Sequence, residues 1–112
     1  MAITPIDMYN AQPAATNTTL YTGLANEIVT ITKTTATNDT TTATYISFHI
    51  VPTGGSVGDA NIVINRKTIG SRETKELWEL EGHVIEYGDI LSAIAQTASI
   101  ITVHVSGVKK TT

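Results

Sequence analysis

The sequence contains no cysteine among its 112 residues. This absence excludes disulfide bonds, a cysteine nucleophile and every metal site built from thiolates. Charge is also scarce, because charged residues make up only 15% of the chain, against roughly 25% in an ordinary soluble domain. The net charge is -3 at pH 7. Because a nucleic-acid binder needs a dense cationic face, we expect no nucleic-acid partner.

Targeting and membrane-spanning patterns are missing as well. The first 20 residues hold no Lys or Arg, unlike the charged start of a Sec-type signal peptide. No apolar stretch approaches the length of about 18 residues that a membrane-spanning helix requires. We therefore expect neither a secretory leader nor a membrane partner.

The most abundant residues are β-branched. With 21 Thr, 14 Ile and 8 Val, they account for 43 of the 112 residues. Branching at Cβ restricts χ1, lowers helix propensity and suits the pleated surface of a sheet. Much of the polar surface must then come from Thr, Ser and Asn, whose desolvation on docking to another protein costs less than that of Lys or Glu.

From residue 19 onward, apolar and polar residues alternate with a period of two. Ile46 and Phe48 share one face of their segment, and Val103 and Val105 share one face of another, with His104 on the opposite side. Turn signals separate about seven to eight such short segments, and no long helical pattern is present. The sequence therefore predicts an all-β fold, an antiparallel β-sandwich or jelly roll.

The segments between the predicted strands differ in character. We expect a polar turn at residues 34–42, a glycine-rich loop at 52–59 and a polar, basic connection at 65–75. Residues 76–80 suit either a strand or one helical turn. Gly88-Asp89 predicts a tight turn between two strands.

An extended N-terminal arm is predicted at residues 1–18, ahead of a single β-sandwich domain at 19–110. Pro5 and Pro13 disfavour helix in the arm. The apolar residues of the arm are Ile3, Ile6, Met8 and Tyr9. They predict that the arm docks, either on its own domain or on a neighbouring subunit.

Charge is concentrated in one part of the chain, because ten of the 17 charged residues lie between Arg66 and Asp89. These charges suit a solvated sheet edge that discourages stray strand pairing. They also suit a dipolar patch that meets its complement on a symmetry mate. On the second interpretation, the candidate contact residues are Arg66, Lys67 and Arg72, with the single tryptophan, Trp78, as an anchor.

The three histidines are the only imidazoles available for a metal. His49 and His104 would share one outer face if their strands were neighbours, and His83 would complete a three-ligand zinc site. No pair of them has the short spacing of a metal-binding motif. We therefore predict no metal site.

Neighbouring carboxylates raise the possibility of a glycosidase-like acid and nucleophile pair, with Glu79, Glu81 and Glu86 as candidates. A domain of this size offers little room for a substrate cleft between them. The sequence also lacks the G-x-S-x-G elbow of a serine hydrolase, and no G-K-[ST] follows its glycine-rich loop. We predict that the protein is not an enzyme and needs no cofactor.

Four short motifs together resemble a known group of proteins. They are L-Y-T at residues 20–22, V-P-T-G-G at 51–55, Y-G-D-I-L-S-A at 87–93 and V-H-V-S-G-V at 103–108. The chain resembles the small all-β virion proteins of tailed bacteriophages, which include capsid decoration or stapling proteins and small tail or fibre components. The resemblance covers about residues 19–109.

The resemblance implies a non-enzymatic structural protein on the exterior of the virion capsid, assembled in the host cytoplasm. Its expected partners are the major capsid protein subunits, which it would staple together, and further copies of itself in a dimer or trimer. The alternative is a tail or fibre component that acts as a receptor- or glycan-binding β module. In that case Trp78 and several tyrosines would form an aromatic platform for sugars.

Overall fold

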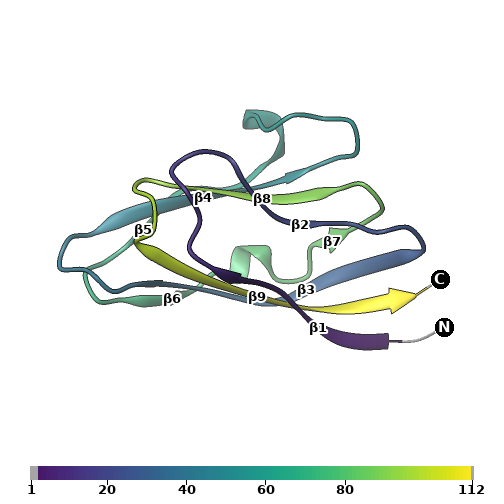
Figure 1. Ribbon diagram of the computed structural model, residues 1–112, viewed down its shortest axis with the longest axis horizontal. Coiled ribbons are helices and arrows are strands. Elements are labelled where there is room, and N and C mark those ends of the chain that lie inside the picture. Colours follow the sequence, from purple (N-terminus) through teal and green to yellow (C-terminus); the bar gives the residue numbers. More distant parts are fainter. Residues whose placement is uncertain (1–2, 112) are drawn as a thin grey trace.

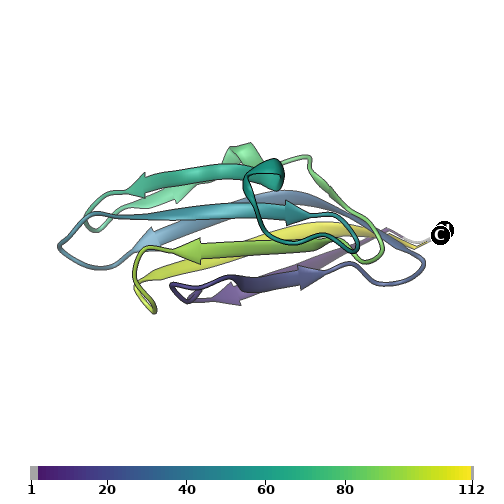
Figure 2. The ribbon, with the colours of Figure 1, turned by 90° about the horizontal axis from the view of Figure 1, so that it is seen from above.

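Two antiparallel sheets pack face to face in the computed structural model, which describes residues 3–111 (Figure 1, Figure 2). The first sheet has the strand order β1-β9-β3-β6, with β7 also paired to β3. Its strands are β1 (Ile3–Ala11), β3 (Glu27–Asn38), β6 (Thr74–Glu76), β7 (Val84–Ile85) and β9 (Ile101–Thr111). The second sheet has the order β2-β8-β4-β5. Its strands are β2 (Thr18–Thr22), β4 (Thr44–Val51), β5 (Ile62–Ile69) and β8 (Ile90–Ala95).

The order of the strands is that of a jelly roll. The chain passes from one sheet to the other at most connections, and the first strand, β1, lies beside the last strand, β9. Every pairing is antiparallel, and the two short 3-10 helices are η1 (Asp59–Asn61) and η2 (Trp78–Leu80). The prediction of an all-β antiparallel sandwich is therefore confirmed.

The core lies between the sheets and follows the predicted alternation. Ile46 and Phe48 on β4 are fully buried, as are Val103 and Val105 on β9, while His104 between them is exposed. Burying a side chain of this size contributes about 1.5–3 kcal/mol. The inward-facing side chains of both sheets thus provide the main stabilisation of the sandwich.

The segment predicted as an N-terminal arm is extended, and the structure places residues 3–11 in the domain's own first sheet. Strand β1 pairs with β9 from Ile3 opposite Lys110 to Ala11 opposite Val103. Met8 follows the outward-facing Asp7 and points inward, where it is 7% exposed. An irregularity in the register at Met8 lets the next residue, Tyr9, lie opposite the buried Val105. A Cβ atom on Gly107 would lie 2.7 Å from the Met8 sulfur, so the glycine makes room for it. The described sandwich therefore starts at Ile3, ahead of the boundary expected at residue 19.

Two segments that were expected to be connections belong in part to strands, and the described residues form nine strands in all. Strand β3 continues through residues 34–38, and β5 continues through residues 65–69. Their Thr, Asn and Lys residues show no apolar alternation in the sequence. Polar residues can nevertheless occupy inward positions of these strands, because hydrogen bonds satisfy buried side chains such as that of Asn38. Residues 78–80 form one helical turn, η2, in which Leu80 is buried.

Candidate functional site

Exposed apolar side chains gather at one end of the sandwich. Among residues 3–111, the exposed large hydrophobic side chains are Ile3, Leu24, Trp78, Val84 and Tyr87. All except Trp78 belong to strands or turns at the end of the molecule that also carries both chain termini (Figure 1). Exposed apolar residues that lie together mark interaction surfaces more often than single ones do.

The register of the first sheet places several of these residues on its outer face. Ile3 on β1 and Ile28 on β3 both lie opposite Lys110 of β9, one on each side. Residues directly opposite one another point to the same face, and two strand spacings separate Ile3 from Ile28 by about 10 Å. In the neighbouring row, Val84 and Val108 lie opposite the same residue of β3.

Leu24 and Tyr87 lie on two turns that are joined by backbone hydrogen bonds. Gly23 donates its N–H to the carbonyl of Asp89 at 2.9 Å, and Gly88 donates to the carbonyl of Gly23 at 3.1 Å. Gly88 has a φ of +83°, which favours glycine. These bonds hold the turn of Leu24 beside the turn of Tyr87.

We call this surface the apolar end. It consists of Ile3, Leu24, Ile28, Val84, Tyr87 and Val108. Behind it, Lys109 and Glu27 form an ion pair at 3.1 Å, with side chains that are 31% and 12% exposed. This pair neutralises the charges that lie nearest the core at this end. Lys110, which lies between Ile3 and Ile28 on the same face, adds one cation, so the surface offers a partner apolar contact together with a positive charge.

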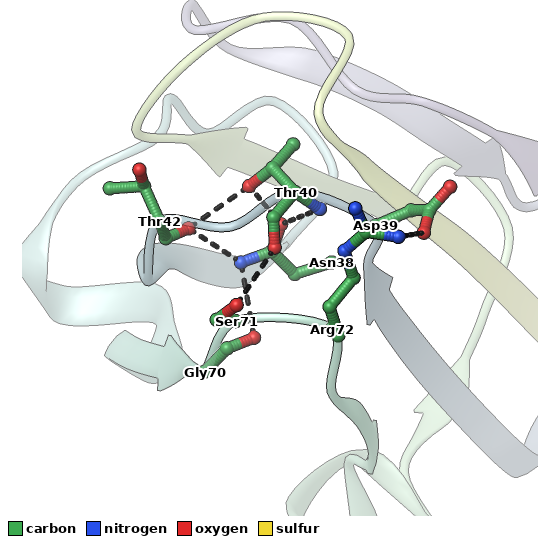
Figure 3. A network of polar contacts seen from close by, with 7 residues as sticks. All are labelled: Asn38, Asp39, Thr40, Thr42, Gly70, Ser71 and Arg72. Atoms are coloured by element: carbon green, nitrogen blue, oxygen red, sulfur yellow. Dashed lines mark hydrogen bonds and ion pairs between the residues drawn. The ribbon is translucent and has the colours of Figure 1, made fainter.

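The opposite end of the sandwich is polar and is organised by Asn38 (Figure 3). The buried Asn38 amide donates towards the carbonyls of Thr42 at 2.9 Å and Gly70 at 3.1 Å, and it accepts from the Thr40 hydroxyl at 2.7 Å. The β3–β4 turn is thereby tied to the β5–β6 turn. This end therefore consists of hydrogen-bonded turns rather than apolar side chains.

The structure brings together two of the predicted contact residues, Lys67 and Trp78. The Lys67 ammonium lies 5.9 Å from the centre of the Trp78 ring and donates to Glu79 at 2.6 Å. This hydrogen bond lowers the pKa of the Glu79 carboxyl below its ordinary value, although burial acts in the opposite direction. Trp78 is 69% exposed, so the tryptophan does not fill the core.

The other two predicted cations lie on different surfaces. The Arg66 guanidinium lies 5.5 Å from the centre of the Tyr45 ring on the second sheet. Arg72 pairs with Asp39 at 3.4 Å in the polar end, and both side chains are largely exposed. An exposed pair of this kind contributes little to stability. The charged residues between 66 and 89 are therefore spread over several surfaces.

The four apolar residues of the predicted arm differ in exposure. Ile3 is 68% exposed, Ile6 and Tyr9 are half-buried, and Met8 belongs to the core. Of the four, only Ile3 has most of its side chain exposed and available for contact with a partner.

The three histidines lie apart in the fold. His49 is on β4 in the second sheet, His104 is on β9 in the first, and His83 precedes β7. His49 and His104 therefore do not share a face. Within the described range 3–111, no three acidic or imidazole side chains are close enough to hold a metal ion together.

The candidate catalytic carboxylates have different surroundings. Glu79 binds Lys67, whereas a hydrogen bond with Glu76 raises the pKa of Glu81. Glu86 lies in the turn next to Tyr87 at the apolar end. The structure thus gives Glu79 and Glu81 different partners.

Among residues 3–111, no helix has the length and hydropathy needed to cross a membrane.

Leu24, Val84 and Tyr87 were not selected as contact residues from the sequence. Leu24 follows Gly23, and Tyr87 precedes Gly88, so each is a large apolar residue within a turn. Turns usually carry small or polar residues, so a large apolar residue in a turn is the sequence feature that could have identified Leu24 and Tyr87 as contact residues. The pairing that places β7 beside β3 was not visible in the sequence, so Val84 had no such signal.

Comparisons with known proteins bear on the fold. No protein-family model matches the sequence, and no curated protein matches it. A solved structure described as Bacillus endospore appendages that form a novel family of disulfide-linked pili is similar, with a TM-score of 0.54 and 13% sequence identity. The similarity covers 99% of this chain and 91% of that one. At this identity the chain shares the fold of that protein, an all-β sandwich.

Proposed function

We propose that this chain is a non-enzymatic structural subunit that attaches in many copies to a larger protein assembly through its apolar end. The resemblance to small phage virion proteins favours one form of this role. In that form the chain lies on the capsid exterior and staples neighbouring major capsid subunits, which stabilises the shell.

The observation that carries the proposal is the gathering of Ile3, Leu24, Val84 and Tyr87 at one end. Burying these four side chains contributes at most about 6–12 kcal/mol, and association costs about 4–15 kcal/mol in lost freedom of motion, so the two terms largely cancel. A single copy would therefore bind weakly through this surface. Attachment as a dimer or trimer to a repeating lattice would convert weak contacts into firm binding.

Association between copies has a second possible route along β1. Its outer edge has no strand partner among the described residues, because β9 pairs with its other side. Pro5 lacks an N–H and limits pairing at its own position. Contacts of β1 in a dimer or trimer would thus involve the remaining residues of this edge.

Copy number in purified particles tests the role in the capsid. Quantitative mass spectrometry should find copies in fixed proportion to the major capsid protein, in the range of hundreds per particle. A handful of copies per particle would contradict decoration.

A second candidate is a fibre subunit, in a tail or fibre component that binds a receptor or glycan. The fold shared with a pilus protein favours it, as do the elongated extents of 46 × 27 × 19 Å and two chemically different ends. Because the chain has no cysteine, such a fibre would be held together without disulfides. Electron microscopy of the concentrated protein tests this form: filaments that withstand reductant support it, and particles that stay discrete at every concentration contradict it.

A further inference from the structure

The outer face of the second sheet contains a groove that the structural role does not use. It has a volume of about 370 Å³, within the size range of small-molecule sites. Its floor is formed by β4, β5 and β8, and its sides by the connections 12–17 and 52–61. Figure 2 shows β4 and β8 between these two connections, and Figure 1 shows both connections at the top of the view.

Both sides of the groove are fixed by hydrogen bonds. In the first connection, the carbonyl of Ala14 accepts the N–H of Ala95 at 3.1 Å. In the second, the Asn61 amide donates to the carbonyl of Ser56 at 2.8 Å and its oxygen accepts from the N–H of Gly58 at 3.2 Å. The groove is therefore formed before any ligand arrives, which lowers the entropic cost of binding.

The groove contains a buried polar group without a protein partner. His49 lines it, is only 5% exposed and has a buried Nδ1 atom with no hydrogen-bond partner among residues 3–111. Leaving such an atom unpaired carries a free-energy cost. A ligand hydroxyl in the groove would recover part of that cost once the imidazole turns its Nδ1 atom towards the ligand.

An irregular backbone positions the cation of the groove. Asn65 and Arg66 of β5 together lie opposite Ser47 of β4, which is a β-bulge. Arg66 has a φ of +50°, a conformation that non-glycine residues rarely adopt, and its N–H donates to the Ser47 hydroxyl at 2.9 Å. Unusual backbone of this kind is concentrated at functional sites.

The result of the bulge is a guanidinium that is free to bind a ligand. Arg66 lies 5.5 Å from the Tyr45 ring and forms no ion pair within the described chain. Gln96 is nearby, and its oxygen accepts from Thr44 at 3.2 Å, which leaves its NH2 group available as a donor. The lining thus combines the Arg66 cation, the Asp59 carboxylate, neutral donors and acceptors, apolar side chains and one aromatic ring.

We propose that this groove binds a small acidic saccharide. Its carboxylate pairs with the Arg66 guanidinium, and its hydroxyls bind His49, Asn65 and the Gln96 amide. A saccharide offers many hydroxyls to the neutral polar groups and to the Asp59 carboxylate, which accepts hydrogen bonds, and its own carboxylate matches the fork of the Arg66 guanidinium. The binding does not depend on attachment through the apolar end.

The test is NMR titration of the ¹⁵N-labelled protein with D-glucuronic acid, D-glucose and acetate. We expect glucuronic acid to shift the signals of Ser47, Asn65 and Arg66, with weaker binding of the other two. Arg66→Asn removes the guanidinium but suits the backbone, since Asn tolerates positive φ, and it should weaken binding about tenfold or more. Arg72→Asn is the matched control, because Arg72 also has a positive φ of +55° and lies at the polar end.

Each remaining outcome overturns the proposal in a different way. If glucose binds as tightly as glucuronic acid, the proposed pairing of the carboxylate with Arg66 is wrong. If acetate binds as tightly, the proposed binding of saccharide hydroxyls is wrong. An absence of shifts in the groove, or equal weakening by Arg66→Asn and Arg72→Asn, would overturn the site itself. None of these results bears on copy number, which tests the structural role separately.

Discussion

Gly88 donates its backbone N–H to the carbonyl of Gly23 at 3.1 Å, and this bond joins the two turns that carry Leu24 and Tyr87. Both glycines sit where side chains would interfere with the contact between the turns. A Cβ atom on Gly23 would overlap the carbonyl group of Glu86, and one on Gly88 would press on the Thr53 side chain. The geometry of the apolar end therefore depends on these two positions.

We predict that Gly23→Ala destabilises the domain by about 2–4 kcal/mol, because the backbone carbonyl of Glu86 cannot move aside cheaply. Chemical denaturation measures the change. Gly58→Ala is the control and should cost less than about 0.5 kcal/mol, since Gly58 is extended and its surroundings are open. Equal stability of the two variants would contradict the tight contact between the turns.

Tyr87→Ser should weaken attachment to the native assembly by about tenfold or more, because a large apolar contact is lost. The stability of the free domain should change by less than about 0.5 kcal/mol, since the side chain is exposed. Trp78→Ser is matched to it, because both side chains are 69% exposed. Cosedimentation with particles measures the attachment. If Trp78→Ser abolishes attachment and Tyr87→Ser does not, the surface around Lys67 and Trp78 is the interface and the apolar end is not.

At the polar end, Asn38→Ala should lower the free energy of unfolding by about 2–4 kcal/mol. The substitution leaves the carbonyls of Thr42, Ile69 and Gly70 without their shared donor in a largely buried setting. Asn10→Ala on the exposed side of β1 serves as the control, with an expected change of less than about 0.5 kcal/mol. Thermal or urea denaturation that shows similar losses for both variants would argue against this network as a stabilising element.

The stability of the fold should also depend on the protonation of His49. Burial lowers the pKa of this imidazole, and the nearby Asp59 carboxylate offsets part of the effect. The unfolded chain, in which His has a pKa of about 6.5, then binds protons more readily than the folded domain. The free energy of unfolding is therefore expected to fall as the pH drops below about 6.5.

Urea denaturation between neutral and mildly acidic pH measures this dependence. His49→Gln should remove the part of the loss that comes from His49, whereas His104→Gln, at an exposed position of the first sheet, should retain it. An identical pH dependence in wild type and His49→Gln would show that His49 does not contribute.

Much of the fold could be predicted because local patterns determined it. The alternation at Ile46, Phe48, Val103 and Val105 assigns the inward faces without knowledge of the neighbouring strands. Residues 34–38 could not be recognised as a strand, since the buried Asn38 is satisfied by carbonyls more than 30 residues away in the chain. Polar residues whose partners come from distant turns resemble a loop in the sequence.

The candidate surfaces were harder to predict than the core. Ile3 and Ile28 share a face only because β9 lies between β1 and β3, and this strand order is a property of the whole chain. The groove likewise depends on a bulge that turns Arg66 towards Tyr45, and no local signal in the sequence marks it. Sites made by strand order and bulges become visible only when the pairing is known.

The most direct test of the structural role is a cryo-electron microscopy reconstruction of the native assembly, with the copy number determined from the same preparation. We expect many regularly arranged copies whose apolar end, with Leu24 and Tyr87, faces the neighbouring subunits. A few copies per particle, or regular copies with this end exposed to solvent, would contradict it.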